Sequence, residues 1–114
     1  MNVSQHLDYD ALNTLKEIME GDFAFLIETF IQDSHDRLEK LQELMASADG
    51  DGIRRAAHSF KGSCSNLGAL RLASLCAAVE RKALEGRFET LAAEITDIEE
   101  EFAMIKQMLL DFLG

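Results

Sequence analysis

Proline and tryptophan are both absent from the 114 residues, and β-branched residues are few. Because proline breaks or kinks a helix interior, its absence leaves room for long, uninterrupted helices. No apolar run approaches the roughly 20 residues that a membrane-spanning helix needs. The N-terminal residues also lack the basic and apolar regions of a secretory signal. The sequence therefore predicts a protein of the cytoplasm that makes no contact with a membrane.

Cysteine is scarce, with Cys64 and Cys76 as its two occurrences. Their spacing fits neither a CxxC redox motif nor the dense disulfide framework of small secreted domains. We therefore expect both thiols to be reduced and to lie in the hydrophobic core.

Positive charge is in short supply, since 11 basic residues face 21 acidic ones and the formal net charge is −10. Such a chain would be repelled by nucleic-acid phosphates, so nucleic acid is excluded as a partner. The charge is unevenly placed, however. Residues 53–87 hold seven basic and two acidic residues, a local balance of +5 that leaves −15 for the remainder. This basic segment is either a solvated face or a surface for a negatively charged group.

Apolar residues recur at spacings of three and four almost throughout, which predicts an all-α protein. Asp8 is expected to cap the first helix, and Asp51 or Gly52 to begin the third. Four long helices joined by short turns favour an antiparallel up-and-down four-helix bundle. The short first helix would pack across one end, and residues 1–114 would form a single domain. The expected helices cover residues 8–19, 22–47, 51–67, 69–85 and 88–113.

A histidine lies on the outer face of the third expected helix. At 100° per residue, His58 lies about 140° from the direction of the apolar positions, so it should face solvent. Arg54, Lys61 and Ser65 lie beside it, and Gly62 lies opposite the core at about 180°. A glycine inside a helix lowers the stability of the helix by roughly 1 kcal/mol relative to alanine, which indicates that Gly62 has another role. The apolar positions are Ile53, Ala56, Ala57, Phe60, Cys64 and Leu67.

This arrangement indicates phosphoryl chemistry at His58. A lysine three residues away disfavours a charged imidazolium, and a neutral imidazole nitrogen can attack phosphorus. The phosphoryl group then adds nearly two negative charges, which Lys61 is placed to pair with from one turn away. Gly62 would leave space for another protein to bring its reacting atom to His58.

The stretch HSFKGSC at residues 58–64, followed by Leu67-Gly68-Ala69, resembles the signature of histidine-containing phosphotransfer (HPt) domains. The resemblance implies a helical bundle that shuttles phosphoryl groups between receiver-domain aspartates in two-component phosphorelays. It also implies phosphorylation of His58 on Nε2, charge compensation by Lys61, and steric clearance at Gly62. Gly68 would end the helix, and Ala69 would let the next helix pack closely.

Two positions depart from the family's pattern. Cys64 stands where serine or alanine is common, and its inward position makes that a small change. Glu80 stands where some members place a glutamine that hydrogen-bonds the imidazole. Its carboxylate would either orient the Nδ1–H group of His58 or pair only with Arg54 or Arg55.

The sequence has no P-loop and no kinase motif. The acidic run DIEEEF at residues 97–102 reads as a solvated helix face rather than a Mg²⁺ site. We therefore expect a phosphoryl carrier with no cofactor of its own rather than an enzyme. Mg²⁺ and the reacting aspartate would belong to the partner. The resemblance implies response-regulator receiver domains and a hybrid sensor kinase as partners. Met1 and the absence of flanking linkers favour a stand-alone carrier, and we expect it to be a monomer.

For partner docking, Arg54, Arg55, Ser65 and Glu80 are the candidate contacts around His58. Phe25 lies about 160° from the apolar stripe of its helix, and we expect the short first helix to cover it.

Two other functions stay open at this point. One is a helical adaptor that binds partners without being phosphorylated. The other is a cysteine- or histidine-based enzyme, which would need a concave pocket rather than a convex helix surface. A metal enzyme is the weakest option, because His6 and His35 have no partners at ligand spacing.

Overall fold

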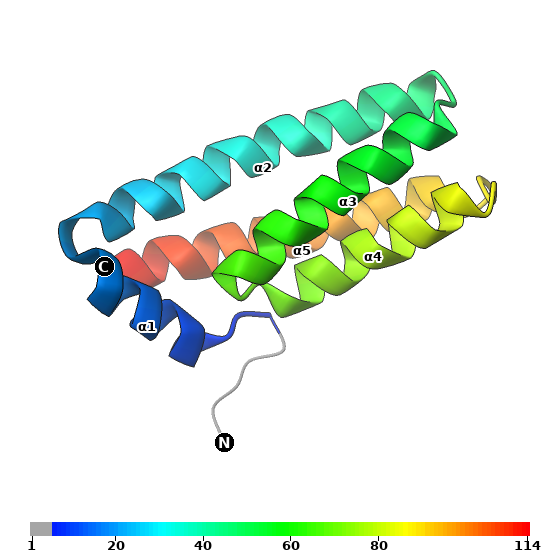
Figure 1. Cartoon of the computed structure of the whole chain (residues 1–114). Helices are drawn as coiled ribbons and strands as arrows, with labels where there is room; N and C mark the ends of the chain where they lie inside the picture. Colours follow the sequence, from blue (N-terminus) through cyan, green and yellow to red (C-terminus); the bar gives the residue numbers. More distant parts are fainter. Residues whose placement is uncertain (1–5) are drawn as a thin grey trace.

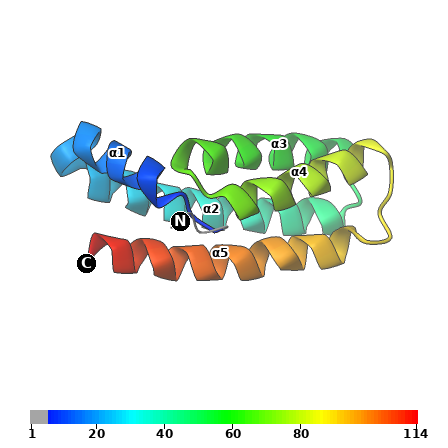
Figure 2. The same ribbon diagram turned by 90° about the horizontal axis from the view of Figure 1, so that it is seen from below.

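The computed structural model describes residues 6–114 and contains four long helices and a short N-terminal one (Figure 1). The four long helices run alternately up and down, and the short helix packs at the end of the bundle where the first long helix begins and the last one ends (Figure 2). The predicted all-α four-helix bundle with an additional N-terminal helix is confirmed. The elements are α1 (Tyr9–Met19), a 3₁₀ turn η1 (Glu20–Asp22), α2 (Phe23–Ala46), α3 (Gly50–Leu67), α4 (Leu70–Leu84) and α5 (Leu91–Leu113).

Side-chain caps fix the start of two helices. The Asp8 carboxylate accepts the backbone N–H of Ala11 at 3.1 Å, so Asp8 caps α1 as predicted. The start of α3 was predicted too late. Asp49, rather than Asp51 or Gly52, is the cap, and its carboxylate accepts the N–H of Gly52 at 2.9 Å. A Cβ at Gly52 would lie 2.6 Å from that carboxylate, so the capping geometry depends on the glycine.

The turn between α3 and α4 is built on Gly68, which ends α3 with a φ of 86°. This left-handed conformation suits glycine because other residues meet a Cβ clash there. The Gly68 carbonyl also accepts the N–H of Asp8 at 2.8 Å, which ties the N-terminal segment to the turn. The fully buried Ala69 then begins the close contact with α4, as the resemblance implied.

The last helix begins at Leu91 rather than at residue 88. The chain first turns through Gly86, which has a φ of 72°. The partly buried Phe88 packs so closely on Gly50 that a Cβ at Gly50 would lie 2.8 Å from its ring. Phe88 therefore anchors the loop to the start of α3 instead of extending α5.

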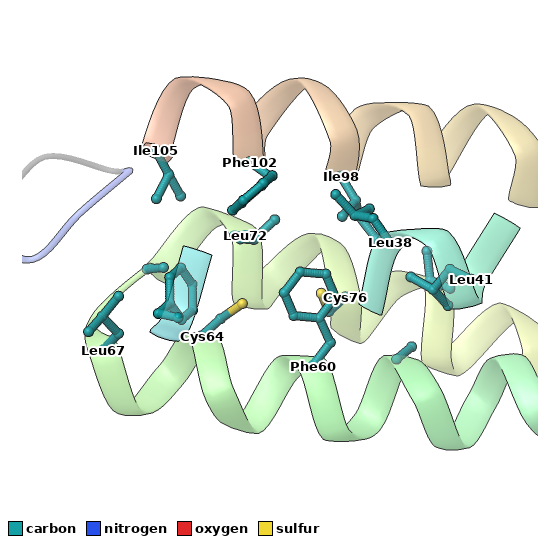
Figure 3. Close-up of a cluster of buried hydrophobic side chains, with 14 of the residues drawn as sticks. Leu38, Leu41, Phe60, Cys64, Leu67, Leu72, Cys76, Ile98, Phe102 and Ile105 are labelled. Atoms are coloured by element: carbon teal, nitrogen blue, oxygen red, sulfur yellow. The ribbon is translucent and has the colours of Figure 1, made fainter. Parts of the chain in front are cut away.

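The core runs along the centre of the bundle (Figure 3). Every apolar position predicted on α3 is buried apart from Ala56, which is partly buried. Cys64 of α3 and Cys76 of α4 are both free thiols inside this core, as predicted. The hydrogen bond between the two thiols, together with burial, raises the pKa of Cys64 far above its usual range. A thiol in that state is an unreactive packing group.

The acidic run 97–102 is not a uniformly solvated face, because Glu101 is only 6% exposed. Its carboxylate meets His6 Nδ1 at 2.7 Å and Arg71 Nε at 3.4 Å. At 100° per residue, position 101 lies about 40° from Ile105 and 60° from Ile98, which are both inward-facing. Glu101 therefore lies at the edge of the buried stripe and needs partners.

The expectation that α1 covers Phe25 is wrong, because this residue is 72% exposed. Tyr9 of α1 and Phe23 of α2 both pack on Phe112 of α5, with ring centroids 5.9 Å apart in each pair. These ring contacts hold the first helix against the end of α5 and leave Phe25 exposed. Within residues 6–114, no helix combines the length and the apolarity needed to cross a bilayer.

Candidate functional site

The imidazole of His58 stands on the solvent side of α3, with 66% of its side chain exposed. Its neighbours Ala57 and Phe60 are fully buried, so the same helix turn presents one face to the core and the other to solvent. The outward position predicted from the helix angle is confirmed. The bundle thus holds the ring on a rigid element while leaving it open to a partner.

The carboxylate of Glu80, on α4, joins the side chains of His58 and Lys61 of α3. One of its oxygens, Oε2, lies 2.8 Å from Nδ1 of His58, and the other, Oε1, accepts Nζ of Lys61 at 2.7 Å. Glu80 is 20% exposed, so this contact is partly shielded from water. The alternative in which Glu80 pairs with Arg54 or Arg55 is wrong. Both arginines pair instead with Asp51 on their own helix, at 3.1 and 3.2 Å.

The charge state of Glu80 determines which nitrogen of His58 is available. The hydrogen bond from Lys61 lowers the pKa of Glu80, burial opposes this, and the contact with His58 lowers it further. Glu80 is therefore ionised at neutral pH and can only accept hydrogen bonds. Nδ1 of His58 therefore carries a proton, and in the neutral form of the ring the lone pair is on Nε2. Among residues 6–114, no group hydrogen-bonds Nε2.

Gly62 leaves bare backbone on the exposed flank of α3, one turn after His58. A Cβ built at this position meets nothing within 4 Å. The situation differs at Gly50 and Gly52, where a Cβ would collide with Phe88 or Asp49. Packing within the described chain therefore does not require a glycine at position 62, although glycine destabilises the helix.

The other predicted site residues lie around this centre without contacting it. Arg54 and Ser65 are on the same side of α3 as His58, one turn before it and about two turns after it. Arg55 lies toward α2 and lines a groove of about 470 Å³ between α2 and α3. The structure thus brings together His58, Lys61 and Glu80.

Sequence analysis missed Arg37 of α2, whose Nη1 donates to Oγ of Ser59 at 2.7 Å, directly beside His58. Arg37 and Lys40 line the groove between α2 and α3 together with Arg55. Arg37 and Lys40 are the two basic residues of α2, whose other charged residues are acidic. This contrast was the feature of the sequence that could have indicated them. Their position extends the positive surface from α3 onto α2.

The residues of this site are not arranged as metal ligands. In the part of the chain from His6 to Gly114, no group of three or more histidine, cysteine or acidic side chains is close enough to hold a metal ion. The site consists of an exposed imidazole, an ammonium group and a carboxylate that joins them.

Comparison with known proteins gives concordant results. The Hpt domain family matches residues 26–110, a range that contains the whole site. Sensor protein TorS of Escherichia coli is 36% identical over 86 residues, which are 74% of this chain and 9% of that protein. The chain thus spans less than a tenth of that curated relative.

Two solved structures share the fold. Histidine-containing phosphotransfer protein B of Pseudomonas aeruginosa has a TM-score of 0.91 and 38% identity, with 93% of this chain and 92% of that chain covered. A histidine-containing phosphotransfer protein from maize has a TM-score of 0.81 over 91% of this chain and 84% of its own, and its 19% identity supports the fold alone. The chain therefore belongs to the Hpt domain family, whose members are histidine phosphocarriers of phosphorelays rather than kinases.

Proposed function

We propose that this chain carries a phosphoryl group on Nε2 of His58, accepts it from the aspartyl phosphate of one receiver domain and passes it to another. The observation that supports the proposal is the contact between Glu80 and Nδ1 on an exposed ring, because it leaves Nε2 as the nitrogen that can attack phosphorus.

In the transfer step, the lone pair of Nε2 forms the N–P bond while the P–O bond to the aspartate breaks. The electrons of that bond leave with the aspartate oxygen as a carboxylate. The ring keeps its Nδ1 proton and becomes a phosphorylated imidazolium, whose positive charge faces Glu80. The reverse steps deliver the group to the next aspartate, so no proton needs to enter or leave.

Lys61 would stabilise the transferred group. Its ammonium is one turn from His58 and is held by Glu80 in the absence of phosphate. Phosphoryl transfer depends mainly on positioning and charge stabilisation, and a mobile ammonium suits the spread charge of the phosphoryl oxygens. Lys61 is therefore proposed to turn from Glu80 toward the phosphoryl group as it arrives.

The partner surface follows from the surroundings of His58. Gly62 would give a receiver domain steric clearance, and Arg37, Lys40 and Arg55 in the adjacent groove would attract its acidic active-site surface. The exposed Phe25 offers apolar contact farther along α2. Mg²⁺ and the aspartate are proposed to come from the receiver. One copy of the chain supplies His58, Lys61 and Glu80, so a monomer suffices.

The test is labelling by a receiver domain that carries radioactive phosphate on its aspartate. The wild-type chain should acquire acid-labile, alkali-stable label, and His58→Gln should acquire none. His35→Gln is the matched control, since it makes the same change on α2 and should be labelled like the wild type. Circular dichroism checks that both variants keep their helicity. Label on His58→Gln at the wild-type level would refute the carrier function. Receiver binding without any labelling of the wild type would favour the adaptor instead.

A further inference from the structure

The group that faces Nδ1 of His58 is a carboxylate, and both of its oxygens are occupied. Oε2 meets His58 and Oε1 meets Lys61. A glutamine at this position would carry no negative charge and would have a single acceptor oxygen to serve both groups. Its amide nitrogen would instead be a donor. The difference between the two residues bears on the phosphorylated ring.

A histidine phosphorylated on Nε2 has two forms. With a proton on Nδ1 it is an imidazolium, and without that proton Nδ1 carries a lone pair. An ionised Glu80 accepts a hydrogen bond from the first form and repels the lone pair of the second. A glutamine can turn its NH₂ group toward the lone pair and so stabilise the second form.

The two forms differ as phosphoryl donors. When the N–P bond of the imidazolium breaks, the electron pair returns to Nε2 and a neutral imidazole leaves. The same cleavage from the unprotonated ring would expel an imidazolate anion, which is a far poorer leaving group. The protonated ring is therefore the form that transfers its phosphoryl group readily, to a receiver aspartate or to water.

The other charged groups around the ring do not replace Glu80. On α3, Lys61 is a cation that disfavours a positive charge on the ring, and it pairs with Glu80. On α2, Arg37 is a further cation, which donates to Ser59. Arg54 and Arg55 are paired with Asp51. Glu80 of α4 is the anion in contact with the imidazole.

From this geometry, and given the proposed phosphorylation of His58, we infer that Glu80 is a positioning residue that keeps the phosphorylated ring protonated. The carboxylate makes this chain a fast phosphoryl donor with a short-lived phosphohistidine, rather than a store of phosphoryl groups.

The experiment phosphorylates the wild type and Glu80→Gln with potassium phosphoramidate and follows loss of the phosphoryl group by ³¹P NMR between pH 5.5 and 9. An opposite charge at hydrogen-bond distance shifts a titration by about one unit or more. The midpoint at which the ring loses its Nδ1 proton should therefore lie about one pH unit lower in Glu80→Gln. Phosphoryl loss at pH 8.5 should be about tenfold slower. At pH 5.5 both rings are protonated, so the two rates should converge.

Glu85→Gln is the matched control. Glu85 is the other acidic residue of the basic segment 53–87, and it pairs with Arg87 rather than with the site. This variant should keep the wild-type midpoint and rates. Glu80→Asp, which retains a carboxylate, should recover at least part of the shift and provides the test if Glu80→Gln takes up too little phosphate.

Equal midpoints and equal rates in the wild type and Glu80→Gln would overturn the inference while leaving His58 as the carrier. A rate difference of the same size at every pH would also overturn it, since general distortion of the site would have that effect. Failure of the wild type to be labelled at His58 by either phosphoramidate or a receiver would refute the proposed function, and this inference with it.

Discussion

At the scale of single residues, the site depends on one carboxylate that meets two donors. Glu80 accepts hydrogen bonds from Nδ1 of His58 and from Nζ of Lys61, so it holds the two side chains together. Sequence patterns predicted the outward ring and the neighbouring cation, because both follow from the 100° helix angle. The partner of Glu80 could not be predicted, since the choice between His58 and the two arginines depends on how α4 lies against α3.

Replacing Lys61 by alanine should slow transfer from a receiver to His58 by roughly 10- to 100-fold, because the developing phosphoryl charge loses its cation. Stability should change by no more than about 1 kcal/mol, since Lys61 forms a partly exposed ion pair. Quench-flow labelling measures the rate, and urea denaturation measures the free energy of unfolding.

Lys106→Ala on α5 is the control, because that lysine contacts His35 and lies outside the site. Its transfer rate should equal that of the wild type. An unchanged rate in Lys61→Ala would mean that the lysine only anchors Glu80.

At the scale of elements, α3 combines a buried face with an open one. Its apolar stripe was predictable from the sequence, because helix periodicity fixes the angle of each residue. The first residue of α3 could not be predicted, because two aspartates, Asp49 and Asp51, precede the apolar run. Asp49 is the cap because Gly52 comes close enough to donate its N–H to that carboxylate. The buried Glu101 of α5 was missed for a related reason, since its partners lie on other elements.

A larger side chain on the exposed face of α3 should have opposite effects on the stability of the protein and on its reaction with a receiver domain. Gly62→Gln should stabilise the protein by up to about 1 kcal/mol, because glutamine is the better helix former and the chain leaves room for a Cβ there. Transfer from a receiver should nevertheless fall by at least tenfold. Uptake from the small donor phosphoramidate should stay at the wild-type rate.

Gly62→Ala serves as the graded control and should give an intermediate transfer rate. If Gly62→Gln exchanged phosphate with receivers as fast as the wild type, the clearance assigned to this glycine would be wrong.

At the scale of the whole molecule, the charge is polarised. The chain carries −10 in total, yet residues 53–87 carry +5, and Arg37 and Lys40 of α2 extend this positive region beside His58. The positions of the charged residues along the sequence indicated this uneven distribution, whereas the contribution of α2 depends on how α2 packs against α3. Such a field orients an approaching acidic partner and keeps the acidic faces away from it.

Association with a receiver domain should therefore slow several-fold as the salt concentration rises from about 0.05 to 0.5 M, because screening shortens the reach of the field. Lys40→Gln should lower the association rate and its salt dependence while leaving dissociation nearly unchanged. Stopped-flow fluorescence with a labelled receiver measures both rates. Lys106→Gln is the control on α5, and a rate independent of salt would contradict steering by this surface.

The central claim is that Nε2 of His58 receives the phosphoryl group while Glu80 holds the proton on Nδ1. The most direct measurement is a ¹H–¹⁵N NMR spectrum of the histidine rings, recorded before and after transfer from a phosphorylated receiver. We expect ³¹P coupling at Nε2 of His58, with Nδ1 still protonated and the other two histidine rings unchanged. Phosphorus on Nδ1, or on any residue other than His58, would contradict the account.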